Sequence, residues 1–461
     1  MSDYQLIVIG AGPGGYVAAL RAAKLGLKVA VVENRQAGGT CLNRGCVPTK
    51  TLLHSSQIYH DIRTGEHAGI TADTVNIDMN AIFAHKRAVS EKLSSGIEGM
   101  FKGAKVDLIR GTGTILGTGR VSVATEEGVK EYTCENILAA TGSVPARPPI
   151  PGLDLPGVLT SDELLEGCDH LYKSIVIIGG GVIGVEFATF YNDLGCDVTI
   201  IEGMDRLLPT MDRELGQNLA QILKKRGVKL HLNSMVKNVE ETAEGTTVNF
   251  VTKDVEGSAT GEVVLCAIGR KPYLDGLFTE DCKPEMNGKS IKVDERYLTS
   301  IPGVYAIGDV SSKIQLAHVA SAQGTACVEM LCGVENYVSQ SVVPSCIYSR
   351  PEIAVVGMTD AEAKAAGIPA KAGKCAMFGN AKTVIMDGDR SFMKVVAHAE
   401  THKVLGAQLM CEHATDMISQ VAQAIANDMT AEQLLLAMRP HPTFEEVLSE
   451  ALEDLVEKLN K

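Results

Sequence analysis

The sequence has no tryptophan and few aromatic residues of any kind. Phenylalanine and tyrosine make up 4% of its 461 residues, which leaves few side chains for stacking on nucleic-acid bases. Basic residues are also in deficit, because 43 Lys and Arg stand against 56 Asp and Glu, giving a net charge of −13. Such a charge repels phosphate backbones and anionic membrane surfaces. We therefore expect no nucleic-acid partner.

Long apolar runs and targeting signals are missing as well. No stretch reaches the roughly 18 consecutive apolar residues that a bilayer span requires, so we expect no membrane span. The chain begins MSDYQLIVIG, which runs directly into an expected strand without the basic stretch and apolar core of a signal peptide. We therefore expect a cytoplasmic protein, or a mature form in the mitochondrial matrix.

The twelve cysteines are scattered through a long chain, which is typical of a reduced protein and not of a secreted disulfide scaffold. Two pairs share the spacing Cys-x4-Cys. Cys327 and Cys332 fall in an expected helix, where a rise of about 1.5 Å per residue holds the Cα atoms beyond the roughly 7 Å bridging limit. Cys41 and Cys46 are thus the pair with chemical potential. No metal site is expected.

A glycine-rich turn follows the first expected strand. Gly10, Gly12 and Gly15 form a GxGxxG pattern between the apolar strand YQLIVIG and the alanine-rich helical stretch YVAALRAAKLG. Such glycines allow a tight turn and let the backbone approach a pyrophosphate at the positive end of a helix. The next expected strand ends at Glu33, whose carboxylate can accept hydrogen bonds from ribose hydroxyls. This arrangement predicts a dinucleotide site.

The same design recurs in the middle of the chain, with Gly179, Gly181, Gly184 and Glu202. The acid follows the first glycine by 23 residues in both copies. Each copy also has a later strand that ends on a glycine turn, at Gly142 and at Gly269. Two matched copies in the same context predict that two dinucleotides are bound.

The segment QAGGTCLNRGCVPTKTLLHSSQ carries the most specific pattern. It matches GGTCxNxGCxPxK in full, with Gly38, Gly39, Thr40, Cys41, Asn43, Gly45, Cys46, Pro48 and Lys50. On this pattern the chain resembles the pyridine nucleotide-disulfide oxidoreductases, and later motifs follow in the family's order along essentially the whole chain. The resemblance implies FAD and NAD as cofactors and a redox-active disulfide between the two cysteines.

The resemblance also implies residue roles. Cys46 would face the flavin as a thiolate, Cys41 would exchange with the substrate, and Lys50 would lie near the flavin ring with Glu186 as its ionic partner. Independently of the family, Pro48 suits the first turn of a helix, whose positive end would favour a thiolate at Cys46.

Two later segments resemble further motifs of the family. In SIPGVYAIGDVSSKIQLAHVASAQG a strand ends before Asp309, which would hold the ribityl chain of the flavin. Ala317 would contact the isoalloxazine through its backbone, while the neighbouring His318 is interpreted as an ordinary helix start. Near the C-terminus, His441 and Glu446 stand in an HPTxxE pattern, which implies a base and its orienting carboxylate acting on the partner subunit of a homodimer.

These features predict an α/β fold with two Rossmann-like dinucleotide-binding domains and a C-terminal α+β dimerisation domain. The proline-rich PARPPIPG marks the first boundary. We expect an FAD-binding unit at 1–148 with the redox disulfide, an NAD-binding unit at 149–271, a central unit at 272–344 that completes the FAD site, and a dimerisation unit at 345–461.

Within the family, the chain is most similar to dihydrolipoamide dehydrogenases, which would oxidise a dihydrolipoyl group on a 2-oxo acid dehydrogenase or glycine cleavage complex. Glu202 favours NAD over NADP, because a 2′-phosphate would meet its negative charge. Arg44 departs from the usual motif and leaves open a reductase of another small disulfide, using NADH or NADPH. A flavin-binding interaction protein with an unused redox centre is the alternative of a different class. Which complex is served and the direction of flux stay open.

Overall fold

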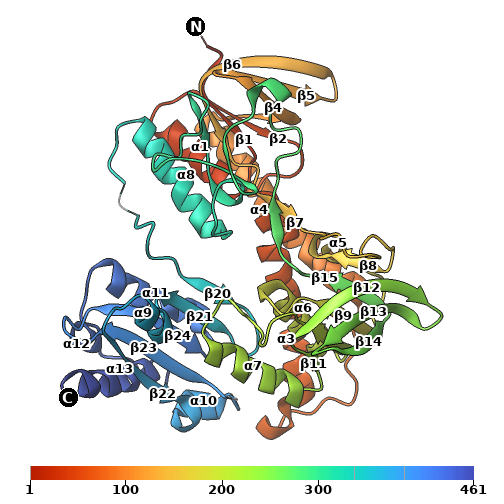
Figure 1. Ribbon diagram of the computed structural model, residues 1–461, viewed down its shortest axis with the longest axis vertical. Coiled ribbons are helices and arrows are strands. Elements are labelled where there is room, and N and C mark those ends of the chain that lie inside the picture. The colour runs from red at the N-terminus through yellow and green to blue at the C-terminus, as the bar shows by residue number, and fades with distance from the viewer. Residues whose placement is uncertain (1, 337, 389) are drawn as a thin grey trace.

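The computed structural model describes residues 2–336, 338–388 and 390–461. Figure 1 shows three packed regions, with an N-terminal sheet at the top, a second sheet at the lower right and a C-terminal sheet at the lower left. Among the described residues, none of the helices combines the length and apolar character that a membrane crossing requires.

The N-terminal sheet has its strands in the order β3 (Asp107–Arg110), β2 (Val29–Glu33), β1 (Tyr4–Ile9), β6 (Gly128–Ala139), β5 (Arg120–Thr125) and β4 (Thr112–Gly117). The pairings among β1, β2, β3 and the end of β6 are parallel, whereas β4 and β5 are antiparallel. Strand β19 (Val304–Ala306) pairs in parallel with β6. The region expected to complete the FAD site therefore contributes a strand to this sheet.

Helices cover one face of the N-terminal sheet. Leu6 and Val8 of β1 are fully buried in a cluster with the alanines of α1 (Pro13–Lys24) and with Val328 of α8 (Ala317–Leu331). Because side chains alternate along a strand, the other residues of β1 pack on the opposite face. The small side chains of α1 let α8 lie close beside it (Figure 1).

The second sheet is parallel throughout, in the order β11 (Lys229–His231), β10 (Asp197–Ile201), β9 (Ser174–Ile178), β15 (Val263–Cys266) and β8 (Val158–Thr160). An antiparallel sheet follows β11, made of β12 (Ser234–Thr242), β13 (Gly245–Thr252) and β14 (Val255–Gly261). The flanking helices are α5 (Ser161–Glu166), α6 (Val182–Asp193) and α7 (Arg213–Lys225). Two short pairings complete this part, β7 (Ser143–Pro145) with β16 (Arg270–Pro272) and β17 (Met286–Asn287) with β18 (Ser290–Ile291).

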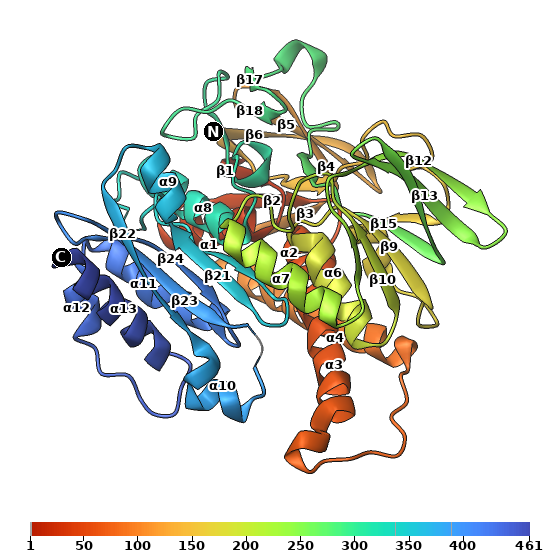
Figure 2. The same cartoon turned by 60° about the horizontal axis from the view of Figure 1, so that its bottom comes forward.

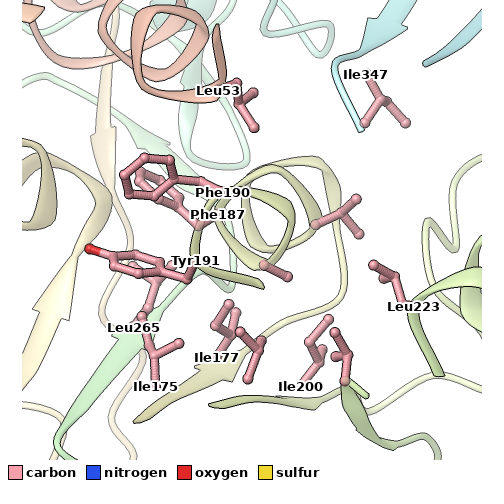
Figure 3. Close-up of a cluster of buried hydrophobic side chains, with 14 of the residues drawn as sticks. Leu53, Ile175, Ile177, Phe187, Phe190, Tyr191, Ile200, Leu223, Leu265 and Ile347 are labelled. Atoms are coloured by element: carbon pink, nitrogen blue, oxygen red, sulfur yellow. The ribbon is translucent and has the colours of Figure 1, made fainter. Parts of the chain in front are cut away.

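Helix α6 lies at the centre of an apolar cluster that joins several regions of the chain. Its Phe187, Phe190 and Tyr191 lie above the isoleucines of β9 and β10, and Leu53 and Ile347 reach the same cluster from other regions (Figure 3). Each large apolar side chain that is fully buried contributes about 1.5–3 kcal/mol to the stability of the fold. The position of α6 relative to the other regions is therefore tightly constrained.

Two helices project from the N-terminal region, α3 (Cys46–Thr64) and α4 (Met79–Ala104), as Figure 2 shows. The short helix α2 (Gly39–Arg44) precedes α3, and the 3-10 turn η1 (Gly65–Ala68) follows it. Two further 3-10 turns lie in the central part of the chain, η2 (Glu280–Cys282) and η3 (Gly308–Val310).

The C-terminal sheet is fully antiparallel, in the order β20 (Ser345–Ile347), β21 (Ile353–Gly357), β24 (Val404–Met410), β23 (Phe392–His398) and β22 (Ala370–Ala376). Its helices are α9 (Asp360–Ala365), α10 (Ala381–Ile385), α11 (Ala414–Ala426), α12 (Ala431–Leu435) and α13 (Glu446–Leu459), with a 3-10 turn η4 (Met377–Gly379) before α10. The predicted fold class, two Rossmann-like units followed by an α+β unit, is confirmed.

Candidate functional site

A single cavity of about 1590 Å³ runs between the two nucleotide-type sheets and reaches the C-terminal region. Most of the predicted cofactor and redox residues line it: Gly10, Gly12, Glu33, Cys41, Cys46, Lys50, Gly142, Gly179, Gly181, Glu186, Glu202, Gly269, Asp309 and Ala317. Ligand pockets usually measure about 300–1,000 Å³. The size therefore suits two dinucleotides that meet end to end.

The two glycine turns are built alike. Gly10 has φ +106° and Gly179 has φ +111°, and a Cβ on either would lie 2.4–2.5 Å from a backbone carbonyl oxygen. The glycines at the start of each helix, Gly15 and Gly184, pack against the preceding turn, with 1.8 Å and 2.0 Å to an added Cβ. These four positions exclude a side chain for steric reasons.

The middle glycine of each turn lacks a side chain for a different reason. An added Cβ on Gly12 would meet nothing nearer than 3.9 Å, and one on Gly181 nothing within 4 Å, yet both residues line the cavity. A side chain here would fill the space in which a pyrophosphate approaches the helix N-terminus. The residues present thus fit a dinucleotide at each turn.

The acids at the strand ends hold their turns with the same hydrogen bonds. Glu33 accepts from the backbone N–H of Ala11 at 2.7 Å and of Arg35 at 2.8 Å. Glu202 accepts from Gly180 at 2.6 Å and from Met204 at 2.7 Å. Both carboxylates are only 8% exposed and stand beside the cavity. The duplication read from the sequence therefore extends to individual hydrogen bonds.

The predicted redox pair lies on two consecutive helices. Cys41 belongs to α2, and Cys46 is the first residue of α3, so the amino end of α3 points at its sulfur. The two side chains are unbridged thiols that form a hydrogen bond with each other. Both line the cavity, where a substrate disulfide and a flavin could reach them.

The environment makes these thiols unequal. The hydrogen bond from Cys41 and the positive charge of Lys50 lower the pKa of Cys46 to about 7. The same hydrogen bond, together with burial, raises the pKa of Cys41 far above that of an ordinary thiol. A single thiolate at Cys46 is therefore the stable form of the reduced pair near neutral pH.

Lys50 lies one turn beyond Cys46 on α3, and Glu186 faces it from α6. The Lys50 Nζ is 2.8 Å from both carboxylate oxygens of Glu186, as the family resemblance implied. Burial favours the neutral amine, but Glu186 outweighs it, so the pKa of Lys50 is raised. The cavity thus contains a fixed ammonium next to the Cys46 sulfur.

Tyr348, which sequence reasoning missed, completes this cluster. Its backbone N–H donates to Glu186 Oε1 at 3.1 Å, and the Lys50 Nζ lies 4.6 Å from its ring centroid. Only proximity in the fold reveals this residue, because it follows Glu186 by 162 residues. A third cysteine, Cys346, lines the same cavity from β20.

Arg44 lines the same cavity, but its guanidinium is engaged by residues other than the redox cysteines. Its Nη1 donates to Gln36 Oε1 at 3.0 Å, and its Nε lies 3.9 Å from Asp162 on α5. The positive charge of Lys50, and not that of Arg44, is among the largest influences on the pKa of Cys41 and of Cys46. In this structure the nearby acid Asp162 is the ionic partner of Arg44.

Asp309 is held by residues from two other segments. Ser143 Oγ donates to Asp309 Oδ2 at 2.6 Å, and Arg270 Nε donates to Ser143 Oγ at 2.8 Å. Burial raises the pKa of Asp309. Ser143 and Arg270 directly follow Gly142 and Gly269, whose φ angles are +72° and +123°. The two glycine turns, which are recognisable in the sequence, could therefore have pointed to both residues.

Ala317 begins helix α8 as expected, and its neighbour His318 makes one further contact. The His318 Nε2 is 2.9 Å from the carbonyl oxygen of Pro344. This bond links the start of α8 to the segment that leads into the C-terminal sheet.

His441 and Glu446 form the predicted pair on the C-terminal region. The His441 Nδ1 is 2.8 Å from Glu446 Oε1, and Thr443 N–H donates to Glu446 Oε2 at 2.9 Å. These bonds lower the pKa of Glu446. The His441 side chain is 72% exposed and does not line the cavity described here. One chain alone therefore does not bring His441 to the cysteines.

Dihydrolipoyl dehydrogenases and a flavoprotein disulfide reductase resemble this chain over most of its length. A dihydrolipoyl dehydrogenase of Bacillus subtilis is 38% identical over 458 residues, covering 98% of this chain and 96% of that protein. Among solved structures, LpdA of Mycobacterium tuberculosis has a TM-score of 0.90 at 28% identity, covering 97% of this chain and 99% of its own. The HOCl-induced flavoprotein disulfide reductase RclA of Escherichia coli has a TM-score of 0.85 at 28% identity, covering 98% and 99%.

Family models match almost the whole chain. Residues 4–324 match the pyridine nucleotide-disulphide oxidoreductase model, and residues 343–452 match the dimerisation domain of the same family. The duplicated turns, the thiol pair and the C-terminal unit agree with these matches. The chain thus belongs to the pyridine nucleotide-disulphide oxidoreductases, flavoproteins that bind FAD and a pyridine nucleotide and carry a redox-active disulfide and a dimerisation domain.

Proposed function

We propose that this enzyme is an NAD-dependent dihydrolipoamide dehydrogenase, which oxidises protein-bound dihydrolipoamide to lipoamide. The observation that carries the proposal is the asymmetric thiol pair, in which Cys46 lies beside the Lys50–Glu186 ion pair and has a pKa lowered to about 7. Relatives named dihydrolipoyl dehydrogenase at 36–38% identity support it. The acid Glu202 supports NAD as the acceptor.

The chain's own residues account for the dithiol half of the reaction. His441 of the partner subunit takes the proton of one substrate thiol, and the resulting thiolate attacks Cys41 of the oxidised disulfide. The Cys41–Cys46 bond breaks, and Cys46 leaves as the thiolate. The second substrate thiol then attacks the substrate sulfur joined to Cys41 and gives its proton to the departing Cys41 sulfur, which releases lipoamide and leaves Cys41 as a thiol.

Each group is suited to its step. Glu446 accepts the ring N–H at Nδ1 and leaves Nε2 free to receive the substrate proton. Lys50 and the amino end of α3 stabilise the departing Cys46 thiolate. When bound, FAD supplies the two-electron carrier between this dithiol and the nicotinamide of NAD. The FAD site residues would be Gly10, Gly12, Gly15, Glu33, Lys50, Gly142, Asp309 and Ala317, and the NAD site residues Gly179, Gly181, Gly184, Glu202 and Gly269.

The proposed partners follow from this activity. We propose a homodimer that receives the lipoyl-bearing protein of a 2-oxo acid dehydrogenase or glycine cleavage complex, in the cytoplasm or in a mitochondrial matrix. We also propose the four units with the boundaries given above.

A second candidate is a reductase of a different small disulfide, favoured by the structural similarity to RclA. One assay separates the two. NADH-dependent reduction of lipoamide is measured beside glutathione disulfide and CoA disulfide, each also with NADPH. The proposal predicts kcat/KM at least about tenfold higher for lipoamide with NADH than for any other combination. A higher value for another disulfide would replace lipoamide as the substrate, and absence of turnover with bound flavin would indicate a binding protein.

A further inference from the structure

A buried amide connects the His441 loop to a helix on the neighbouring part of the C-terminal region. Asn380 is 7% exposed and stands at the N-cap of α10. Its Oδ1 accepts from the backbone N–H of Thr383 at 2.9 Å and from its hydroxyl at 3.0 Å. Its Nδ2 donates to the carbonyl oxygen of Thr443 at 2.9 Å. One end of the amide therefore caps a helix, and the other holds a loop 63 residues away.

Thr443, the residue that Asn380 holds, is also bonded to the His441–Glu446 pair. Thr443 donates its N–H to Glu446 Oε2, and Glu446 Oε1 contacts His441 Nδ1. The same threonine donates its hydroxyl to Pro440 at 2.7 Å. The peptide groups on both sides of Thr443 are thus fixed, one by Asn380 and the other by Glu446. Figure 2 shows α10 and the chain between α12 and α13 in the same part of the molecule.

The loop otherwise has little packing to define its position. In the single chain Leu436 and Met438 are 84% and 97% exposed, and among the described residues Phe444 is the apolar side chain that anchors the loop in the core beneath it. Arg439 adds one polar contact, a hydrogen bond from its Nη1 to Ser449 Oγ at 2.8 Å. A general base must lie within about 2.6–3.2 Å of the proton that it takes. A displacement of about 1 Å can cost up to 10²-fold in rate. Hydrogen bonds to the loop backbone therefore matter more here than in a packed segment.

We propose that Asn380 is a positioning residue for His441, acting through the Thr443 carbonyl, which rests on the proposed role of His441 as the base. Asn380 does not touch the reacting atoms. It fixes the loop backbone so that the His441–Glu446 pair has one orientation when it enters the partner's site. The Nδ2 donor, and not the helix cap, carries this role.

Two substitutions separate the donor from the cap. Asn380→Asp and Asn380→Ser both keep an oxygen that can cap α10, because Asp and Ser are good N-cap residues. An ionised Asp has no donor, and the shorter Ser side chain lacks the amide Nδ2 that reaches the Thr443 carbonyl. The serine variant also avoids burying a charge. The matched control is Thr383→Val, which removes the hydroxyl bonded to Asn380 Oδ1 but leaves the bond to Thr443 intact.

The experiment compares both half-reactions in the flavin-loaded dimer. We expect Asn380→Asp and Asn380→Ser to lower kcat for dihydrolipoamide oxidation by about tenfold. The KM for NAD and the rate of flavin reduction by NADH should stay within about twofold, because they do not use His441. Thr383→Val should stay within about twofold in every assay. Flavin content and dimer size are measured for each variant.

Three results would overturn the inference: unchanged kcat in both Asn380 variants, an equal loss in the NADH half-reaction, or an equal loss in Thr383→Val. A His441→Gln variant tests the proposed function separately. If His441→Gln oxidises the dithiol at the wild-type rate, the proposed base is wrong, and Asn380 has no base to position. If His441→Gln is slow and the Asn380 variants are not, only the role of Asn380 is wrong.

Discussion

Cys41 and Cys46 have identical side chains, yet their surroundings assign them opposite ionisation. The difference comes from position: Cys46 begins α3 beside an ammonium, whereas Cys41 donates its proton within the pair and stays protonated. This difference suits the proposed roles, with Cys46 as the leaving thiolate and Cys41 as the thiol that exchanges with the substrate.

This asymmetry predicts a pH-dependent spectrum in the dithiol-reduced protein. The lowered pKa of Cys46 means that its thiolate is present above about pH 7 and is lost as the pH falls through that value. The long-wavelength thiolate–flavin band should follow this titration. Cys46→Ser should abolish the band, and Cys41→Ser should keep it while losing exchange with substrate. A band that persists in Cys46→Ser would reverse the two roles.

Glu202 predicts the choice of nucleotide. Wild-type enzyme should use NADH far better than NADPH, because the 2′-phosphate would approach a buried carboxylate. Glu202→Gln removes the charge and should reduce the NADH-to-NADPH ratio of kcat/KM by about tenfold or more, since like charges at contact cost several kcal/mol.

The other copy of the motif supplies the control for this measurement. Glu33→Gln removes the corresponding acid at the flavin turn and should weaken flavin retention without changing the nucleotide ratio. Equal kcat/KM for NADH and NADPH in the wild type would rule out the assignment of Glu202.

At the scale of elements, the crossing of α3 and α6 sets the electrostatics of the redox centre. The apolar side of α6 is buried in the central cluster, and this fixes Glu186 at 3% exposure opposite Lys50. Tyr348, from the C-terminal region, contacts Glu186 as the third member of this cluster. The charge beside Cys46 thus depends on three segments of the chain.

Lys50→Met should therefore change both titration and stability. Without the ammonium the pKa of Cys46 rises, so the band should titrate at a higher pH than about 7. The variant leaves Glu186 as a buried, unpaired charge, which should cost about 3 kcal/mol in the free energy of unfolding. Urea denaturation and the pH dependence of the band measure the two effects.

A double variant separates these effects. Lys50→Met combined with Glu186→Leu removes both charges, so much of the lost stability should return. The thiolate should still lack its ammonium, and the titration should remain above that of the wild type. If Lys50→Met alone leaves the titration unchanged, Lys50 does not stabilise the Cys46 thiolate.

At the scale of the whole molecule, the proposed active site is divided between two surfaces of the chain. Cys41 opens onto the cavity, whereas His441 is exposed on the C-terminal region, outside that cavity. The dimerisation domain supports a homodimer, in which we propose that His441 of the second copy lies over the cysteines of the first.

Mixing two inactive variants tests this shared site. His441→Gln should slow dithiol oxidation by roughly 10²-fold or more, the scale of general-base loss, while keeping its flavin. Cys41→Ser should be inactive for a different reason. Heterodimers of the two contain one site with both wild-type groups and should recover up to half of the activity per dimer. If subunit exchange is demonstrated and activity does not return, the site is not shared between subunits.

The amino-acid sequence by itself determined the duplicated nucleotide turns, the redox pair and a helix whose amino end lies near Cys46. These features depend on residues close together in the chain, where spacing and steric limits act directly: a glycine at φ +106° or a thiol at the first position of a helix is a local property. The pairing of Lys50 with Glu186 and of His441 with Glu446 came from resemblance to a family, and the structure contains both bonds.

Only the tertiary structure decided which distant groups share the site. Tyr348 at Glu186, Arg270 on Ser143, β19 beside β6, Arg44 turned to Asp162, and Asn380 on Thr443 all join segments between 63 and 167 residues apart. Their side chains carry no local signal, because a hydrogen bond or an ion pair depends on distance in space, and packing of the apolar cores sets that distance.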